Sequence, residues 1–220
     1  MSCITSRVAN PRCAIARETA TFKPRRVGSR MRFALALCLL SLAAPPSRAE
    51  SVAVRVCFDY ACAHEAQARF DAVTLQSVAR VVSSARDAED ERSRIAYAVA
   101  ELYVAAGRQT PIWRDRGGNR NDDTDVAGAM DCIDHAANTT EFLRVMAHAG
   151  MLRFHRVGDP VRRVRFFVAE HWSASIIESA TGDAHAVDSW FFDPGTPAVV
   201  MPLQAWRDGA PPIPREVKLP

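Results

Sequence analysis

The sequence is poor in the features that mark unusual protein classes. Of its 220 residues, only 10 are glycine and 13 are proline, which excludes collagen-like and low-complexity chains. With 48% apolar and 24% charged residues, the composition is that of a globular protein rather than a disordered chain or a coiled coil. The length suits one domain with its own core. We find no internal repeat.

Several binding motifs are missing as well. The sequence has no Cys-x-x-Cys pair and no His-x-x-x-His pair, which argues against a zinc site and a thioredoxin-like redox site. Zinc stays an alternative because metal-binding side chains crowd one stretch: Asp131, Cys132, Asp134 and His135, with His171. EF-hand spacing is absent. An acidic loop holds Asp122, Asp123 and Asp125. Calcium binding by this loop stays an alternative, and the favoured interpretation is that its carboxylates are solvated.

Outside the N-terminal segment, acidic residues outnumber basic ones. Residues 1–49 hold nine Lys/Arg and one acid, whereas residues 50–220 hold nineteen Lys/Arg and twenty-four acids. The net charge of +3 therefore hides a mildly acidic body. This argues against nucleic acid as the partner.

No apolar run is long enough to span a bilayer. The longest, residues 33–44 (FALALCLLSLAA), falls short of the ~20 residues that a transmembrane helix needs. Arg32 precedes it, prolines follow it, and small residues end at Ala49. These features predict a signal peptide cleaved after Ala49, with Met31 as an alternative start. We expect a signal segment with its extension at 1–49, one domain at 50–210 and an extended tail at 211–220. The mature chain would be periplasmic or secreted, with no stable membrane insertion.

Cleavage would leave three cysteines. Cys57 and Cys62 are predicted to form a disulfide at the tip of a hairpin, since an oxidising compartment favours such bonds. The odd cysteine, Cys132, would then either bridge two chains or serve as a reactive thiol.

Hydrophobic periodicity predicts a mixed α+β domain. An N-terminal hairpin would pair Val52–Phe58 with Gln67–Val73. Helices follow at Thr74, near Asp87 and over residues 132–149, the second ending at Gly107 and the third at Gly150. A polar loop covers 114–128. The last elements are strands at 162–169, 171–178 and 185–192, with a turn at 181–183. We interpret Arg162, Arg163 and Arg165 as a solvated strand face.

The residues that carry chemistry lie in the second half. Cys132 would open a helix, where unpaired backbone N–H groups and the helix dipole lower a thiol pKa below its usual value of about 8.5. A nucleophilic thiol needs a base and a group that orients the base. His171 at a strand start and Asp188 on the next strand supply both types of residue. Asp193 is a rival for the third role, because a tighter turn would bring it opposite His171.

This order resembles the transglutaminase-like branch of the papain-like cysteine hydrolases, and the bacterial transglutaminase-like cysteine proteinases in particular. The matching segments are MDCIDHAANTTEFLRVMAHAG, EHWSASIIE and HAVDSWF, within residues 130–192. The resemblance implies a papain-like core in which the nucleophile helix packs on an antiparallel sheet. It assigns Cys132 as nucleophile, His171 as general acid/base and Asp188 as orienter, and implies a protein or peptide substrate.

The sequence departs from the family pattern in two places. Trp172 follows His171 directly, where the family has an aromatic residue further along, and no oxyanion donor can be assigned. Trp172, Trp190 and Phe191 could form a substrate shelf or belong to the core. The polar residues Asn138, Thr139 and Thr140 could line a cleft or bond to backbone.

The favoured interpretation is an exported thiol hydrolase without an organic cofactor, which cleaves a peptide or amide bond; transfer to an amine would make it a transglutaminase. One alternative is a non-catalytic envelope protein that binds peptide or glycan in the same cleft. Another is a redox protein that cycles Cys132 with Cys57 or Cys62. The oligomeric state is not predicted.

Overall fold

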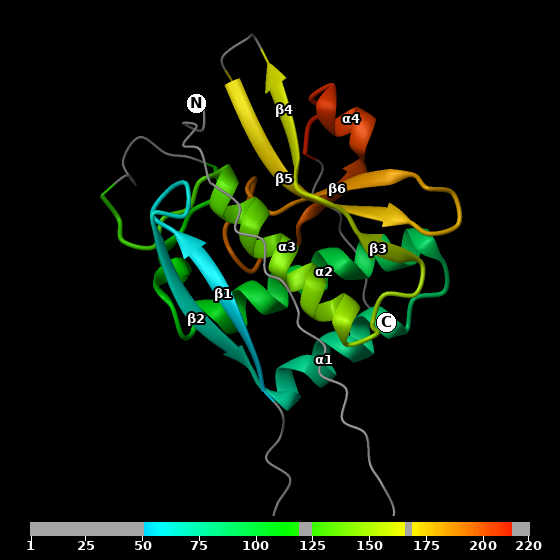
Figure 1. Ribbon diagram of the computed structural model, residues 1–220, viewed down its shortest axis with the longest axis horizontal. Helices are drawn as coiled ribbons and strands as arrows, with labels where there is room; N and C mark the ends of the chain where they lie inside the picture. Colours follow the sequence, from blue (N-terminus) through cyan, green and yellow to red (C-terminus); the bar gives the residue numbers. More distant parts are fainter. Residues whose placement is uncertain (1–50, 119–124, 166–168, 213–220) are drawn as a thin grey trace, which may run out of the picture. The chain divides into compact units, whose positions relative to one another are not determined.

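A two-stranded sheet, a five-stranded antiparallel sheet and four α-helices form the part of the chain that the computed structural model describes, residues 51–118, 125–165 and 169–212 (Figure 1). The expected α+β class is confirmed at this level. The expected signal segment 1–49 and nearly all of the tail 211–220 lie outside the described residues. No helix in the described part is long and apolar enough to cross a bilayer.

The N-terminal hairpin pairs β1 (Val52–Phe58) with β2 (His64–Phe70). The predicted first strand is confirmed, but the predicted second strand, 67–73, begins three residues too late. The chain reverses within five residues, and Asp71 then caps a helix, so no residues remain for a later strand. The predicted disulfide between Cys57 and Cys62 is present and spans this reversal. It is compatible with a location outside the cytoplasm.

Two helices follow the hairpin, and each begins where an aspartate accepts hydrogen bonds from the first turn. The Asp71 carboxylate accepts from the backbone N–H of Thr74 at the start of α1 (Ala72–Ser83), two residues before the predicted start. Asp87 does the same for α2 (Ala88–Gly107), which ends at the predicted glycine. A short 3-10 helix, η1 (Pro111–Arg114), comes next and was not predicted.

Helix α3 (Cys132–His148) matches its prediction within one residue. Asp131 caps its start, and Gly150, with a φ of +68°, ends it in the left-handed conformation that glycine adopts without strain. In Figure 1, α3 lies against β5 and β3 of the large sheet. It also contacts β6, β1 and α2, so this helix joins the hairpin to the sheet.

The large sheet is fully antiparallel. It contains β3 (His155–Val157), β4 (Val161–Arg165), β5 (Ala169–Glu178), β6 (Ala184–Asp188) and β7 (Val199–Pro202), and α4 (Leu203–Arg207) follows β7. Elements β3, β7 and α4 were not predicted. Both β3 and β4 pair with the long β5, but the register moves by one residue between them. Gly158–Pro160 therefore form a bulge that redirects the β4–β5 hairpin.

One arginine departs from the predicted solvated face of β4. Arg162 and Arg165 are exposed, as expected, but Arg163 is half-buried. Its guanidinium carbon lies 4.6 Å from the ring centroid of Trp206, and it donates a hydrogen bond to the Trp206 carbonyl oxygen. Burial lowers the pKa of Arg163, and the Asp188 carboxylate opposes that shift. The prediction was wrong for Arg163 because α4, which covers it, gave no signal in the sequence.

Candidate functional site

His171 and Asp188 form a buried pair across the large sheet. Nε2 of His171 lies 2.7 Å from Oδ2 of Asp188. Since a carboxylate only accepts hydrogen bonds, Nε2 carries the proton and Nδ1 is the acceptor nitrogen. We find no hydrogen bond to this Nδ1 among the described residues. The side chain of His171 keeps 10% of its surface exposed, against 1% for Asp188. The imidazole is thus oriented by the carboxylate and retains one nitrogen for a third group.

Asp188 is held by two further donors. The indole Nε1 of Trp206 donates to Oδ2 at 2.8 Å, and the backbone N–H of Trp190 donates to Oδ1 at 3.1 Å. Trp206 is fully buried. Hydrogen bonds of this kind stabilise a buried charge that would otherwise be costly. Sequence reasoning missed Trp206, because it lies on a five-residue helix with no periodic pattern.

Aromatic rings surround the imidazole of His171. The ring centroids of Trp190, Phe191 and Trp206 lie 4.6, 5.6 and 5.6 Å from that of His171. Of the three aromatic residues considered for a shelf or the core, Trp190 and Phe191 therefore contact the histidine. Trp172 donates its indole N–H to Glu170 instead.

Asp193, the rival to Asp188, lies elsewhere. Its side chain is 51% exposed and accepts a hydrogen bond from the backbone N–H of Gly117 at 2.8 Å. Arg116 lies 3.4 Å from the same carboxylate. Strand β6 ends at Asp188, so the chain leaves the sheet before it reaches Asp193. The geometry favours Asp188 as the partner of His171.

Cys132 is the first residue of α3 and is buried, with 1% of its surface exposed. In the structure Cys132 is disulfide-bonded. Helix α3 packs on β5, the strand that carries His171. Attack by Cys132 on a substrate requires its sulfur as a thiol or thiolate.

The first turn of α3 differs from the expected thiolate site. The Asp131 carboxylate accepts hydrogen bonds from the N–H groups of Ile133 and Asp134, at 2.9 and 3.0 Å. These donors had been expected to face the sulfur. Because Asp131 accepts hydrogen bonds from these N–H groups, they are less available to stabilise a Cys132 thiolate.

Asp134 anchors the reversal between β1 and β2. Its carboxylate accepts hydrogen bonds from the N–H groups of Cys62, Tyr60 and Asp131, at 2.6, 2.9 and 3.1 Å. Burial and the neighbouring Asp131 charge raise the pKa of Asp134 to about 7, while N–H donors oppose this rise. The group therefore changes charge near neutral pH, two residues from Cys132.

The reversal that Asp134 anchors is conformationally unusual. Asp59, Tyr60, Ala61 and Cys62 are four consecutive residues with φ between 54° and 66°. Each costs roughly 1–2 kcal/mol relative to glycine, since a Cβ atom crowds the backbone in this region. Asp134 and the disulfide hold this turn against the start of α3.

Asn138 ties the same helix to β1. Its amide accepts from the N–H of Cys57 at 2.6 Å and donates to the carbonyl of Cys57 at 2.8 Å. Thr139 joins a buried cluster with Tyr103 and Ser189. Asn138 and Thr139 therefore bond to neighbouring groups, and Asn138 and Thr140 also line a hollow of about 210 Å³.

Two other buried histidine–acid pairs occur among the described residues. His135 Nε2 lies 3.0 Å from Asp115, and its Nδ1 lies 2.9 Å from Ser189, so both of its nitrogens have partners. His155 Nδ1 lies 2.7 Å from Glu91, and both side chains are fully buried. Of the three histidines, His171 has the most exposed side chain, which favours it for catalysis.

The residues considered for zinc do not converge, because His135 is directed to Asp115 and Ser189. Within the described ranges, one group has ligand atoms within 4.8 Å of one another: Cys57, Cys62 and Asp134. Its two sulfurs are joined in the disulfide. Of the acids considered for calcium, Asp125 lies in an exposed turn and Asp122 and Asp123 lie outside the described residues.

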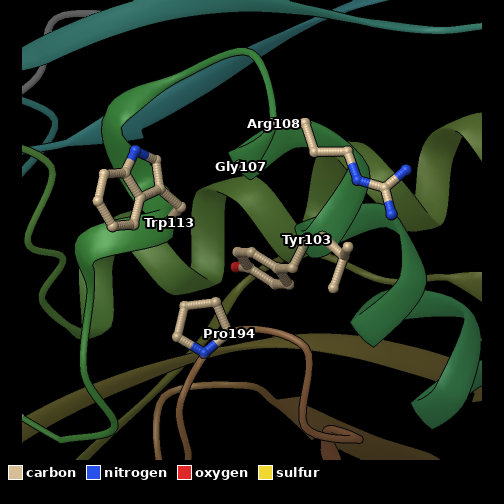
Figure 2. Close-up of a pocket in the computed structure, with 6 residues that line it drawn as sticks. Tyr103, Gly107, Arg108, Trp113 and Pro194 are labelled. Carbon is tan, nitrogen blue, oxygen red and sulfur yellow. The ribbon is translucent and has the colours of Figure 1, made fainter.

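A hollow of about 430 Å³ opens near the end of α2 (Figure 2). It is lined by Tyr103, Val104, Gly107, Arg108, Trp113 and Pro194. Pro194 belongs to the loop that follows β6 and contains Trp190 and Phe191. The same loop therefore borders both His171 and this hollow.

Comparison with known proteins finds no match: no family model, no curated protein and no solved structure resembles this chain significantly.

Proposed function

We propose that this chain is an exported thiol hydrolase of the transglutaminase-like type that cleaves a peptide or amide bond. The observation that carries the proposal is the His171–Asp188 pair. Nε2 is fixed at 2.7 Å from the carboxylate, so Nδ1 is oriented as a base. His171 lies on β5, against which the helix that begins at Cys132 packs, and Asp188 lies on the neighbouring β6.

The chemistry begins from Cys132 in its thiol form. His171 Nδ1 then accepts the thiol proton, and the sulfur attacks the substrate carbonyl carbon. The imidazolium, stabilised by Asp188, donates that proton to the leaving amine as the carbon–nitrogen bond breaks. Water, activated by His171, cleaves the resulting thioester. An amine in place of water would give acyl transfer.

A periplasmic or secreted location, a peptide or protein substrate and the absence of an organic cofactor belong to the same proposal. The Cys57–Cys62 disulfide supports an oxidising compartment. The triad needs no cofactor for acyl chemistry.

Selective alkylation tests the proposal. The exported protein is treated with a mild phosphine reductant, and iodoacetamide adducts at Cys132 are quantified by peptide mapping at pH 6.5. We expect His171→Ala to slow this alkylation at least tenfold, because the base that ionises the thiol is gone. The matched control is His148→Ala, since His148 is exposed and lies on α3, the helix that begins at Cys132. Equal rates in both variants would contradict the proposal.

A second candidate is a non-catalytic protein of the same fold that binds peptide or glycan. The use of two α3 N–H groups by Asp131 favours it, because these donors are then less available to a Cys132 thiolate. In that case Cys132→Ala would leave ligand binding intact, and reduction would not create hydrolytic activity.

A further inference from the structure

Trp113 is an exposed aromatic residue that lines two hollows. Its exposed fraction is 63%, and the neighbouring Val104 is 42% exposed. The first hollow, about 430 Å³, is lined by Trp113, Pro194 and Tyr103 (Figure 2). A second, about 300 Å³, shares Gly107, Arg108 and Trp113 with it and reaches Arg114. Exposed tryptophans in hollows of this size are typical of ligand sites.

Close backbone packing shapes the walls. A Cβ atom on Gly107 would lie 3.2 Å from the Cβ atom of Trp113, so glycine lets η1 approach the end of α2. A Cβ atom on Gly195 would lie 2.9 Å from Val104, so the loop after β6 also rests on α2. The walls thus belong to three segments in direct contact, which favours a preformed site.

The polar groups at the rim are cationic. Arg108 and Arg114 are exposed, and neither pairs with a carboxylate within 51–118, 125–165 and 169–212. The guanidinium carbon of Arg114 lies 5.0 Å from the Trp113 ring centroid. In Figure 2, Arg108 and Trp113 stand on opposite sides of Tyr103. The hydroxyl of Tyr103 is used in the buried cluster with Ser189 and Thr139, so Tyr103 offers only its ring.

We propose that the Trp113 hollows form a subsite for the C-terminal residue of a peptide, with an apolar side chain against Trp113 and Pro194 and its carboxylate at Arg108. Apolar walls next to unpaired guanidinium groups match a ligand that joins an apolar group to an anion. The carboxylate of Asp193, which precedes Pro194, accepts a hydrogen bond from the backbone N–H of Gly117 and is paired with Arg116. As a substrate subsite, this assignment rests on the proposed hydrolase function.

An NMR titration of the full chain tests the subsite without relying on turnover. The probes are N-acetyl-L-phenylalanine, which carries the carboxylate, and N-acetyl-L-phenylalaninamide, which lacks it. We expect saturable shifts of the Trp113 indole N–H and the Gly107 amide with the acid, and at least fivefold weaker binding of the amide. Arg108→Gln should weaken binding of the acid to the level of the amide, and Trp113→Ala should abolish it.

Two variants of exposed α1 residues serve as matched controls: Arg80→Gln and Val73→Ala. Both should bind like the parent chain. Equal affinity for the two probes, or shifts that persist in Trp113→Ala, would overturn the subsite. If binding holds while Cys132 alkylation is independent of His171, the hydrolase proposal fails and the subsite stands. If Cys132 alkylation depends on His171 but the probes do not bind, the subsite fails and the hydrolase proposal stands.

Discussion

Trp206 donates its indole N–H to Oδ2 of Asp188 at 2.8 Å, the same oxygen that faces His171. The two residues are 18 positions apart, and α4 carries the tryptophan across the end of the sheet. The orientation of His171 thus depends on an element outside the hairpin that carries the histidine and the aspartate. This relationship gives the first prediction.

Trp206→Phe should destabilise the protein by about 2–3 kcal/mol. The change removes a hydrogen bond to a buried carboxylate and leaves a small void. Trp172→Phe is the matched control, because Trp172 also donates to a carboxylate, Glu170, but is half-buried. We expect it to cost less than about 1 kcal/mol. Urea denaturation of both variants measures the difference, and equal losses would contradict the role of Trp206.

Substitutions of Asp188 and of Asp193 should have very different effects on the alkylation rate of the Cys132 thiol. Asp188→Ala is expected to slow Cys132 alkylation at pH 6.5 by about tenfold or more, since His171 loses the group that orients it. Asp188→Asn should have a smaller effect, because an amide oxygen can still accept from Nε2. Asp193→Asn should leave the rate unchanged. A loss with Asp193→Asn as large as that with Asp188→Ala would reverse the assignment.

The strained turn between β1 and β2 predicts a stabilising substitution. Ala61 has a φ of +54°, so Ala61→Gly should raise the free energy of unfolding by about 0.5–1 kcal/mol. Ala63 lies just beyond the residues of positive φ. Ala63→Gly should therefore lower stability by about 0.5–1 kcal/mol, because it only adds freedom to the unfolded chain. Thermal unfolding of the two variants shows whether the signs are opposite, and a loss in both would contradict the strain.

The raised pKa of Asp134 predicts that stability falls between pH 4 and pH 7. In this range the folded state, with its pKa of about 7, keeps a proton that the unfolded state has released. Stability therefore declines with rising pH by up to about 1.4 kcal/mol per unit. Asp134→Asn should remove that slope, whatever its effect on overall stability.

Asp71 provides the contrast. Its pKa is lowered by hydrogen bonds from Thr74, so its contribution is lost only as pH falls through the folded-state pKa, below pH 4. Asp71→Asn should therefore keep the decline between pH 4 and pH 7. Urea denaturation at pH 5 and pH 8 distinguishes the variants, and a flat profile in the parent chain would contradict a raised Asp134 pKa.

Much of α2 and α3 could be predicted because their ends are marked locally. Asp87 and Asp131 cap the starts, and Gly107 and Gly150 lie at the ends. The short elements β3, β7 and α4 have three to five residues each, too few for a period to show. The position of β2 depended on a left-handed turn of four non-glycine residues, which propensity does not favour.

Some residues of the candidate site could likewise be predicted from the sequence, and others could not. His171 and Asp188 were predictable, because adjacent antiparallel strands bring such residues together and β6 ends at Asp188. Trp206 and Arg163 were not, since their contacts come from α4 folding over the sheet. The use of the α3 N–H groups by Asp131 was also missed, although an aspartate directly before a helix is a recognisable cap.

The most direct test of the hydrolase proposal is to trap an acyl group on Cys132. The reduced protein is mixed with p-nitrophenyl acetate, and intact-mass analysis with peptide mapping locates the adduct, while Cys132→Ala measures background. We expect a burst of nitrophenolate and an acetyl group on Cys132, both lost in Cys132→Ala and strongly reduced in His171→Ala. Equal nitrophenolate release in all three proteins, with no acetyl group on Cys132, would contradict it.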